Sequence, residues 1–348
     1  MNGNEHDFLA APLWLFTMLH WVTLTLHFLM MSFTLGGLII LLSGRDPGRW
    51  QRPATRRLVR LFPSTMAATV TLGVAPLLFL QIVYHRQVYS ASIVSGWFWL
   101  GIFVAVIIAY YGLYAAALAS DEKLPRRRWL LWLALLGMLY VSLTYSSVFS
   151  LAERPQTYAA LYETNQSGTA WNPHLGQWLP RWLHMVLCAV CIAGYGVAVL
   201  GRDDERMLIA GRRAFGWGML AAAVAGGAQL GSLGEEAAPF MRSSGSWWLT
   251  GSVFLSLLAL GLFFAQRLAL AGVSLALSVL GMVAVRHHVR LVRLGDQLEQ
   301  LPERTQAWPL TIFLCCFALM LVVLAWMARI WCRSAQGVAA IDPIDPSS

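Results

Sequence analysis

The chain has 348 residues, of which 58% are hydrophobic and only 12% are charged, and its formal net charge is +8. Its mean hydropathy of +0.60 is typical of a polytopic membrane protein and excludes an ordinary soluble domain. The positive charge does not indicate nucleic-acid binding. The basic residues lie in short connections between apolar runs, where they set the orientation of a membrane protein.

Long unbroken apolar runs predict transmembrane helices, because a helix satisfies its backbone polar groups within the segment. We count nine runs, each near the ~20 residues that cross a hydrocarbon core. The expected fold class is therefore an all-α polytopic membrane protein. The nine predicted spans are 13–43, 61–84, 95–119, 129–151, 178–200, 214–234, 247–265, 268–286 and 309–331.

The distribution of charge among the connections predicts the orientation, because Lys and Arg concentrate on the inner side of a membrane. The segments that follow the odd-numbered spans hold 17 of the 25 Lys and Arg residues, and the other segments hold eight. We therefore expect the N-terminus outside and the C-terminus inside, in a multi-pass protein of a bacterial inner membrane.

Two stretches of the chain match each other, which predicts an internal duplication. His27 and His184 each lie 18 residues before an arginine and ten residues before a glycine, Gly37 or Gly194. The fourth and eighth spans both contain Leu-Gly-Met. Four helices followed by four in the same order indicate a parallel repeat. The predicted segments are a first four-helix repeat at 13–151, an outer loop at 152–177, a second repeat at 178–290, a ninth transmembrane helix at 309–333 and a disordered tail at 334–348.

All eight histidines fall on the outer side of this topology. His27 and His184 lie roughly 25 Å from the inner end of their spans, at ~1.5 Å per residue. A histidine inside a span is rare unless it has a partner, so two in equivalent places predict a site. His20 lies two turns further out, on almost the same face as His27. The remaining histidines lie at outer helix ends or in outer segments: His6, His85, His174, His287 and His288.

This placement predicts haem b, with one or two haems per chain. Haem iron takes axial imidazoles from facing helices, and the macrocycle needs a mostly apolar slot. His27 and His184 are the first-choice iron ligands, and His20, His288 and His85 compete to complete the coordination. A hydrogen bond between two helices is the alternative role for His27 and His184. Which two histidines share an iron stays open.

The haem propionates need cations at the membrane surface. Arg286 and Arg290, which flank the outer histidine pair of the eighth span, suit that role, as does Arg86. Four glycines are expected to let the flat cofactor approach the backbone: Gly36, Gly37, Gly194 and Gly196. The Cys-Ala-Val-Cys run at 188–191 lacks the histidine that would make it a c-type haem attachment site.

A membrane haem needs an electron donor or acceptor, and a quinol is the usual lipid-soluble one. Quinol oxidation releases protons, so a carboxylate near the outer face would be useful as a proton acceptor. Glu235 and Glu236 follow the sixth span there and are the candidate catalytic residues. Glu153 and Glu163 lie in the outer loop. A solvated helix end is the alternative reading of Glu235 and Glu236.

Four-helix units with haem-ligating histidines towards the outer face resemble the haem-bearing subunit of cytochrome bd-type quinol oxidases. The matching positions are a first-helix histidine, here His27 or His20, and a fifth-helix histidine, here His184. The resemblance covers the first five spans and implies haem b and quinol oxidation. The Gly-Arg-Gln-Pro-Trp motif of those oxidases has no counterpart here, so dioxygen reduction is not implied. The chain is also similar to b-type membrane cytochromes that pass quinol electrons to periplasmic c-type cytochromes.

The expected function is thus that of a membrane b-type cytochrome that transfers electrons between quinol and a periplasmic redox partner, surrounded by membrane lipid. The alternative is a haem-free transporter or a structural membrane anchor, in which the histidines are interfacial or bind a substrate. Transporters built from repeats usually place polar groups near the bilayer midplane. Here the ionisable residues avoid the midplane, which favours the redox function.

Overall fold

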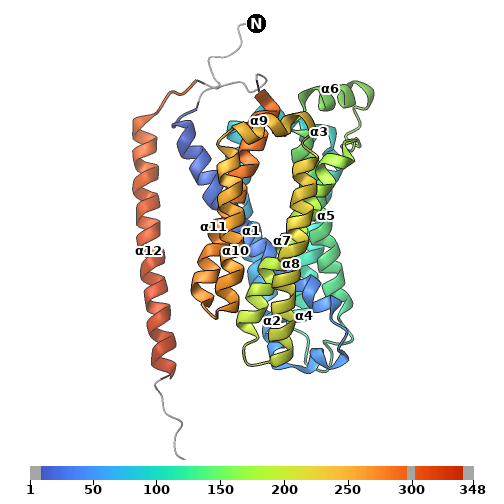
Figure 1. The fold of residues 1–348 in the computed structure, drawn as a ribbon, viewed down its shortest axis with the longest axis vertical. Helices are drawn as coiled ribbons and strands as arrows, with labels where there is room; N and C mark the ends of the chain where they lie inside the picture. Colours follow the sequence, from blue (N-terminus) through green and yellow to red (C-terminus); the bar gives the residue numbers. More distant parts are fainter. Residues whose placement is uncertain (1–8, 296–301, 340–348) are drawn as a thin grey trace, which may run out of the picture. The chain divides into compact units, whose positions relative to one another are not determined.

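The computed structural model describes residues 9–295 and 302–339, and almost all of them are helical (Figure 1). The only β pairing within these residues is an isolated bridge between Leu9 and Glu303. The expected all-α architecture is therefore confirmed. The helices are α1 (Leu13–Ser43), η1 (Pro47–Gln51), α2 (Pro53–Val83), α3 (His85–Val94), α4 (Gly96–Ala117), α5 (Trp129–Leu151), α6 (Pro155–Thr164), α7 (Leu175–Leu200), α8 (Glu205–Gly231), η2 (Gly234–Glu236), α9 (Ala237–Arg242), α10 (Gly245–Phe264), α11 (Leu268–Leu294) and α12 (Ala307–Ala339).

Eight of the described helices are long and apolar enough to cross a membrane. They correspond to every predicted span except the sixth, 214–234, which coincides with α8. That helix has 27 residues, enough to cross a bilayer, but it is less apolar than its neighbours. Its glycines, Trp217 and Gln229 lower the hydropathy of the stretch that follows its charged first turns.

Several element boundaries differ from those predicted. Helix α2 begins at Pro53, because proline is well suited to the first position of a helix. The loop expected at 152–177 contains the helix α6. Helix α12 continues to Ala339, so residues 334–339 of the expected tail are helical. The rest of that tail, 340–348, lies outside the described residues.

The chain divides into two compact units, one of residues 17–299 and one of residues 1–16 with 300–348. In the second unit, a short segment before α1 pairs with the segment before α12. The amide of Leu9 donates to the carbonyl oxygen of Pro302 at 3.0 Å, and the amide of Arg304 donates to that of Leu9 at 2.9 Å. The first unit is a helix bundle that contains every described histidine.

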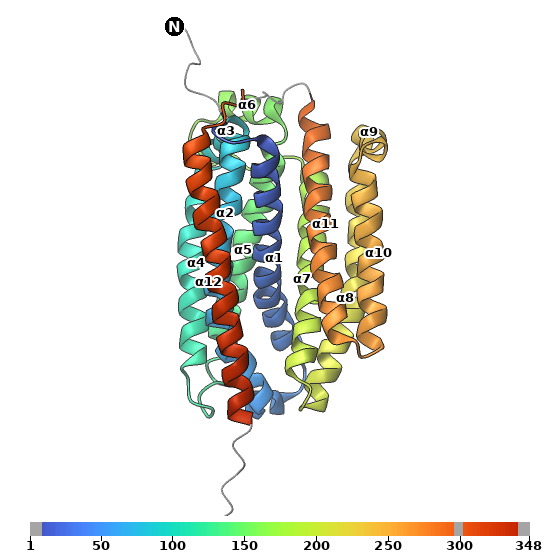
Figure 2. The ribbon, with the colours of Figure 1, turned by 90° about the vertical axis from the view of Figure 1, so that its left-hand side faces the viewer.

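Three antiparallel helix pairs build much of the bundle: α4 with α5, α7 with α8, and α10 with α11 (Figure 2). Glycines let the paired backbones approach closely, as is common in membrane proteins. A Cβ at Gly137 of α5 would lie 2.8 Å from the carbonyl oxygen of Ala105 in α4. Gly281 of α11 likewise faces Ser252 of α10. These are the two glycines of the repeated Leu-Gly-Met run, and both lie in such a pair.

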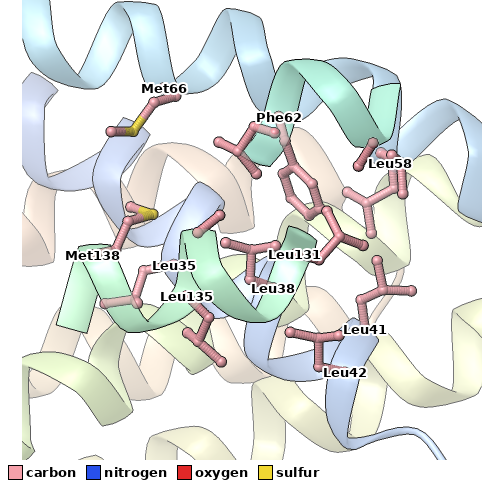
Figure 3. Close-up of a cluster of buried hydrophobic side chains, with 14 of the residues drawn as sticks. Leu35, Leu38, Leu41, Leu42, Leu58, Phe62, Met66, Leu131, Leu135 and Met138 are labelled. Atoms are coloured by element: carbon pink, nitrogen blue, oxygen red, sulfur yellow. The ribbon is translucent and has the colours of Figure 1, made fainter. Parts of the chain in front are cut away.

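Apolar and polar side chains are buried in different parts of the bundle. We call the end that carries α3, α6 and α9 the upper end, as it appears in Figure 1. Towards the lower end, α1, α2 and α5 share a large apolar core (Figure 3). Most of the buried polar side chains lie towards the upper end instead. The residues labelled in the core are Leu35, Leu38, Leu41, Leu42, Leu58, Phe62, Met66, Leu131, Leu135 and Met138.

Candidate functional site

His27 lies near the middle of α1, and its imidazole contacts α2. Its Nδ1 is 2.9 Å from the carbonyl oxygen of Thr69. A carbonyl only accepts hydrogen bonds, so Nδ1 carries the proton and Nε2 keeps its lone pair. The ring lies against Gly73, where an added Cβ would come within 2.8 Å of Nδ1. This arrangement fixes both the tautomer and the position of the ring.

His184 is held in the same way between α7 and α8. Its Nδ1 donates to the carbonyl oxygen of Ala222 at 2.7 Å, and its ring lies against Gly226, where an added Cβ would be 3.1 Å from Nδ1. The Sγ atom of Cys188, one turn further along α7, is 3.6 Å from Nε2. A thiol is only a weak hydrogen-bond donor, so the Nε2 lone pair is not strongly engaged.

The two histidine contacts match at five positions. In each, the histidine lies ten residues before a glycine that packs against a phenylalanine of the next helix. That phenylalanine lies seven residues before the accepting carbonyl and eleven before the glycine under the ring. The residues are His27, Gly37, Phe62, Thr69 and Gly73 in one contact, and His184, Gly194, Phe215, Ala222 and Gly226 in the other.

His20 is a third histidine of the same type. It is 6% exposed, and its Nδ1 lies 3.1 Å from the carbonyl oxygen of Pro76 in α2. It precedes His27 by seven residues, so it lies two turns above it, about 10 Å along α1. Both imidazoles of α1 therefore use Nδ1 to hold α2 and keep Nε2 unprotonated.

The histidine pair of α11 has a different environment. His288 uses both ring nitrogens, since Nδ1 lies 2.9 Å from the carbonyl oxygen of Ala284 and Nε2 lies 2.8 Å from Oγ of Ser244. The ring of His287 packs edge-on against Trp21, with 5.5 Å between the ring centroids. His288 is consequently less available as a ligand than the sequence suggested.

The remaining histidines lie apart from these contacts. His85 begins α3, and Arg86 follows it. His174 precedes α7, and its Nε2 is 3.0 Å from Oγ1 of Thr157. Burial and the nearby Arg154 lower the pKa of His174. His6 lies outside the described residues.

The glycines expected to face the cofactor lie against neighbouring helices, so that expectation is wrong for these positions. Gly36 packs against the backbone of Ala189, and Gly194 packs against the backbone of α8. Gly37 lies under the ring of Phe62, and Gly196 under that of Phe33. The glycines that do touch a histidine ring, Gly73 and Gly226, lie at corresponding positions of the partner helices, and their contact with the histidines was not expected from the sequence.

A buried carboxylate organises the upper end of the bundle. The side chain of Glu153 is 1% exposed and forms ion pairs with three arginines of α11. Arg286 makes the closest pair, Arg293 Nη1 lies 3.0 Å away and Arg290 Nε lies 3.5 Å away. The three arginines fall on one face of α11, at spacings of four and three residues. That spacing was visible in the sequence, but the position of their partner was not.

The two candidate catalytic carboxylates have different surroundings. Glu236 accepts from Arg154 at 3.0 Å and from Arg293 Nε at 2.7 Å. It is thus a second counter-ion of the same network. Glu235, in η2, is exposed and makes no ion pair with any described residue. The structure therefore separates two residues that the sequence treated alike.

The network predicts a specific acid sensitivity. Burial alone would raise the pKa of Glu153, but Arg286, Arg293, Arg290 and Arg181 together lower it from 4.5 to about 2. A carboxylate with a lowered pKa in the folded state stabilises fully above its unfolded pKa, and this stabilisation is lost as the pH falls towards the folded pKa. We expect the thermal stability of the wild type to fall between pH 4.5 and pH 2 more steeply than that of Glu153→Gln. Parallel curves for the two proteins, measured by circular dichroism in detergent, would contradict this assignment.

The glycine beneath His27 gives a second prediction. In Gly73→Ala the new methyl group would displace the imidazole and weaken its bond to Thr69. We expect a loss of about 1–3 kcal/mol in the free energy of unfolding, as for other overpacked sites. Gly227→Ala is the matched control, because a Cβ there meets nothing within 4 Å. Equal stability of the two variants would mean that the His27 ring is not held by this contact.

The fold thus defines a multi-pass α-helical membrane protein with a polar, histidine-rich upper end. Comparison of the chain with known protein families and with curated proteins finds no match.

Proposed function

We propose that this protein is a membrane b-type cytochrome that exchanges electrons between a quinol and a periplasmic redox partner. Haem, when bound, supplies one-electron transfer through its iron. The protein is proposed to hold one or two haems between the middle and the upper end of the bundle, and His27 and His184 are the first-choice residues to hold the iron. In this proposal the upper end faces the periplasm of a bacterial inner membrane.

The observation that carries the proposal is the matched geometry of the two histidines. Metal-ligating histidines usually donate the ring N–H that does not face the metal to a carbonyl or carboxylate, which fixes the tautomer. His27 and His184 both donate Nδ1–H to a backbone carbonyl. These bonds are the hydrogen bonds between helices that were the alternative role of the two histidines, and in both cases they leave Nε2 available for ligation. A haem iron needs only two such ligands, whereas a bare zinc ion takes about four.

The geometry also ranks the other candidate ligands. His20 shares the α1 face and the Nδ1 arrangement of His27, so it is the next choice. Its separation from His27 by two turns, about 10 Å, suits contacts with different haems. His288 ranks lower because both of its ring nitrogens are already hydrogen-bonded. His85 is the last candidate for an iron ligand.

Quinol oxidation also requires an acceptor for the released protons. Glu236 is bound by two arginines, so each of its carboxylate oxygens already has a partner. Glu235 is exposed beside it and is the better candidate for this role. A periplasmic c-type cytochrome is the expected electron acceptor, as the resemblance to quinol-oxidising cytochromes b implies.

A reduced-minus-oxidised optical spectrum of the purified protein tests the proposal. We expect the α and Soret bands of a b-type haem. We also expect a soluble quinol to reduce the haem and so to produce these bands. The protein would be expressed with a haem precursor, and circular dichroism would show that it is folded. If it then lacked these bands, the haem hypothesis would be rejected and a transporter or membrane anchor would be the preferred function.

A further inference from the structure

Among the residues that the structure describes, the charges at the upper end of the bundle do not balance. Five arginines take part in the network around Glu153, and the described carboxylates that face them are two, Glu153 and Glu236. Part of this excess positive charge is buried, since the side chain of Arg293 is 1% exposed and that of Arg290 is 9% exposed. Uncompensated buried charge is strongly unfavourable. The arginines of the network are Arg154, Arg181, Arg286, Arg290 and Arg293.

Four of these guanidinium groups retain a buried nitrogen with no hydrogen-bond acceptor among the described residues. The atoms are Nε of Arg154, Nη1 of Arg181, Nη1 of Arg290 and Nη2 of Arg293. Arg181 forms no ion pair with any described residue. Its Nη2 donates to the carbonyl oxygen of Ser146 at 2.5 Å, and its Nε donates to Oγ of the same residue at 3.3 Å. A guanidinium that is buried and only partly paired lacks an anion.

Helix α5 adds donors to the same region. The hydroxyls of Ser147 and Ser150 are 1% and 0% exposed as residues and have no partner among the described atoms. Ser150 precedes Glu153 by three residues, about one helical turn, at the end of α5. Ser146, next to Ser147, already holds Arg181. Guanidinium groups from α7 and α11 thus lie around Glu153 with fewer acceptors among the described residues than donors, and the serine hydroxyls of α5 can serve either role.

We propose that this cluster binds one further oxyanion, a carboxylate or phosphate group with at least two acceptor oxygens. Arg181 and Arg290 would supply charge-assisted donors from α7 and α11, and guanidinium groups match the geometry of such anions. The atoms that lack partners are buried, so the ligand enters the bundle rather than lying on its surface. The site stands without haem. If the proposed function is right, the anion is a haem propionate.

The key variant is Arg181→Gln, because Arg181 can lose its charge without breaking an ion pair. Arg181→Lys retains the charge, and Arg242→Gln removes an exposed arginine of the exposed helix α9 as a control. Each protein is produced under haem limitation and unfolded thermally in detergent with increasing inorganic phosphate, against chloride at equal ionic strength. A ligand of the folded state raises Tm with its concentration. We expect phosphate to raise the Tm of the wild type, Arg181→Lys and Arg242→Gln by several degrees and that of Arg181→Gln by much less.

Two further measurements identify the natural source of the anion. If it is a propionate, the haem-loaded wild type will no longer respond to phosphate, and Arg181→Gln will shift the haem midpoint potential. If it is a lipid phosphate, an anionic lipid will co-purify with the wild type and be lost from Arg181→Gln. Both results support the site. A phosphate response in a protein that binds no haem even when haem is supplied would reject the proposed function and keep the site. No phosphate response in the haem-limited wild type, together with an unchanged potential and no co-purified anionic lipid, would overturn the site, whether or not haem is present.

Discussion

Alanine at His27 or at His184 is expected to remove haem from the purified protein. An alanine cannot replace the Nε2 lone pair, and a b-type haem has no covalent link to hold it. If the two histidines share one iron, each variant loses nearly all of its haem. If each half of the bundle holds its own haem, each variant loses about half of it. Pyridine haemochrome content per protein, measured after identical purification, separates the two arrangements.

The control for these variants is His174→Ala. His174 lies before α7, is hydrogen-bonded to Thr157, and has no part in the matched contacts of His27 and His184. It should keep a full complement of haem. Wild-type haem content in both His27→Ala and His184→Ala would contradict the ligand assignment, and His20 would then become the first candidate. Circular dichroism of each variant distinguishes loss of the ligand from loss of the fold.

The second large effect is expected at Glu153. Replacing it by glutamine leaves three arginines of α11 without their shared counter-ion. Removal of one member of a buried ion pair typically costs about 3–5 kcal/mol, and we expect a loss of that size in the free energy of unfolding of Glu153→Gln. Glu163→Gln is the matched control, because Glu163 is exposed on α6 and its loss should change stability little.

A double variant shows whether charge is the cause. Adding Arg286→Gln to Glu153→Gln removes the closest cation together with the carboxylate. If the destabilisation comes from unpaired charge, the double variant will be more stable than the sum of the two single effects predicts. Strict additivity, or a Glu153→Gln protein as stable as Glu163→Gln, would contradict the role given to this carboxylate.

Much of the fold could be predicted from the sequence because a membrane span is a local property. The long apolar runs located α1, α5 and α7 closely, since length and hydropathy alone decide whether a segment can cross a bilayer. The same criterion was least informative for α8, whose glycines pack against α7 and lower its apolarity. The apolarity that identifies a span is reduced where close helix packing requires small residues.

The candidate site was only partly predictable. The positions of His27 and His184 followed from their shared spacing, but Thr69 and Gly73 became visible only when α2 was placed beside α1. The contact of Glu153 with α11 spans more than 130 residues, and no local pattern specifies such a pair. Which side chains meet between two helices depends on how each helix is rotated about its axis and shifted along it. The periodicity of a single sequence does not reveal these two quantities.

The buried ion network also has a consequence for the order in which the protein is made. Glu153 emerges from the ribosome well before Arg286, Arg290 and Arg293, which lie on the last helix of the bundle. Until that helix is inserted, the first half has a carboxylate at its upper end without the cations that let it be buried. We therefore expect Glu153 to take up its buried position only after α11 has been inserted. Insertion of α11 is then the step that joins the end of α5 to the last helix of the bundle through these ion pairs.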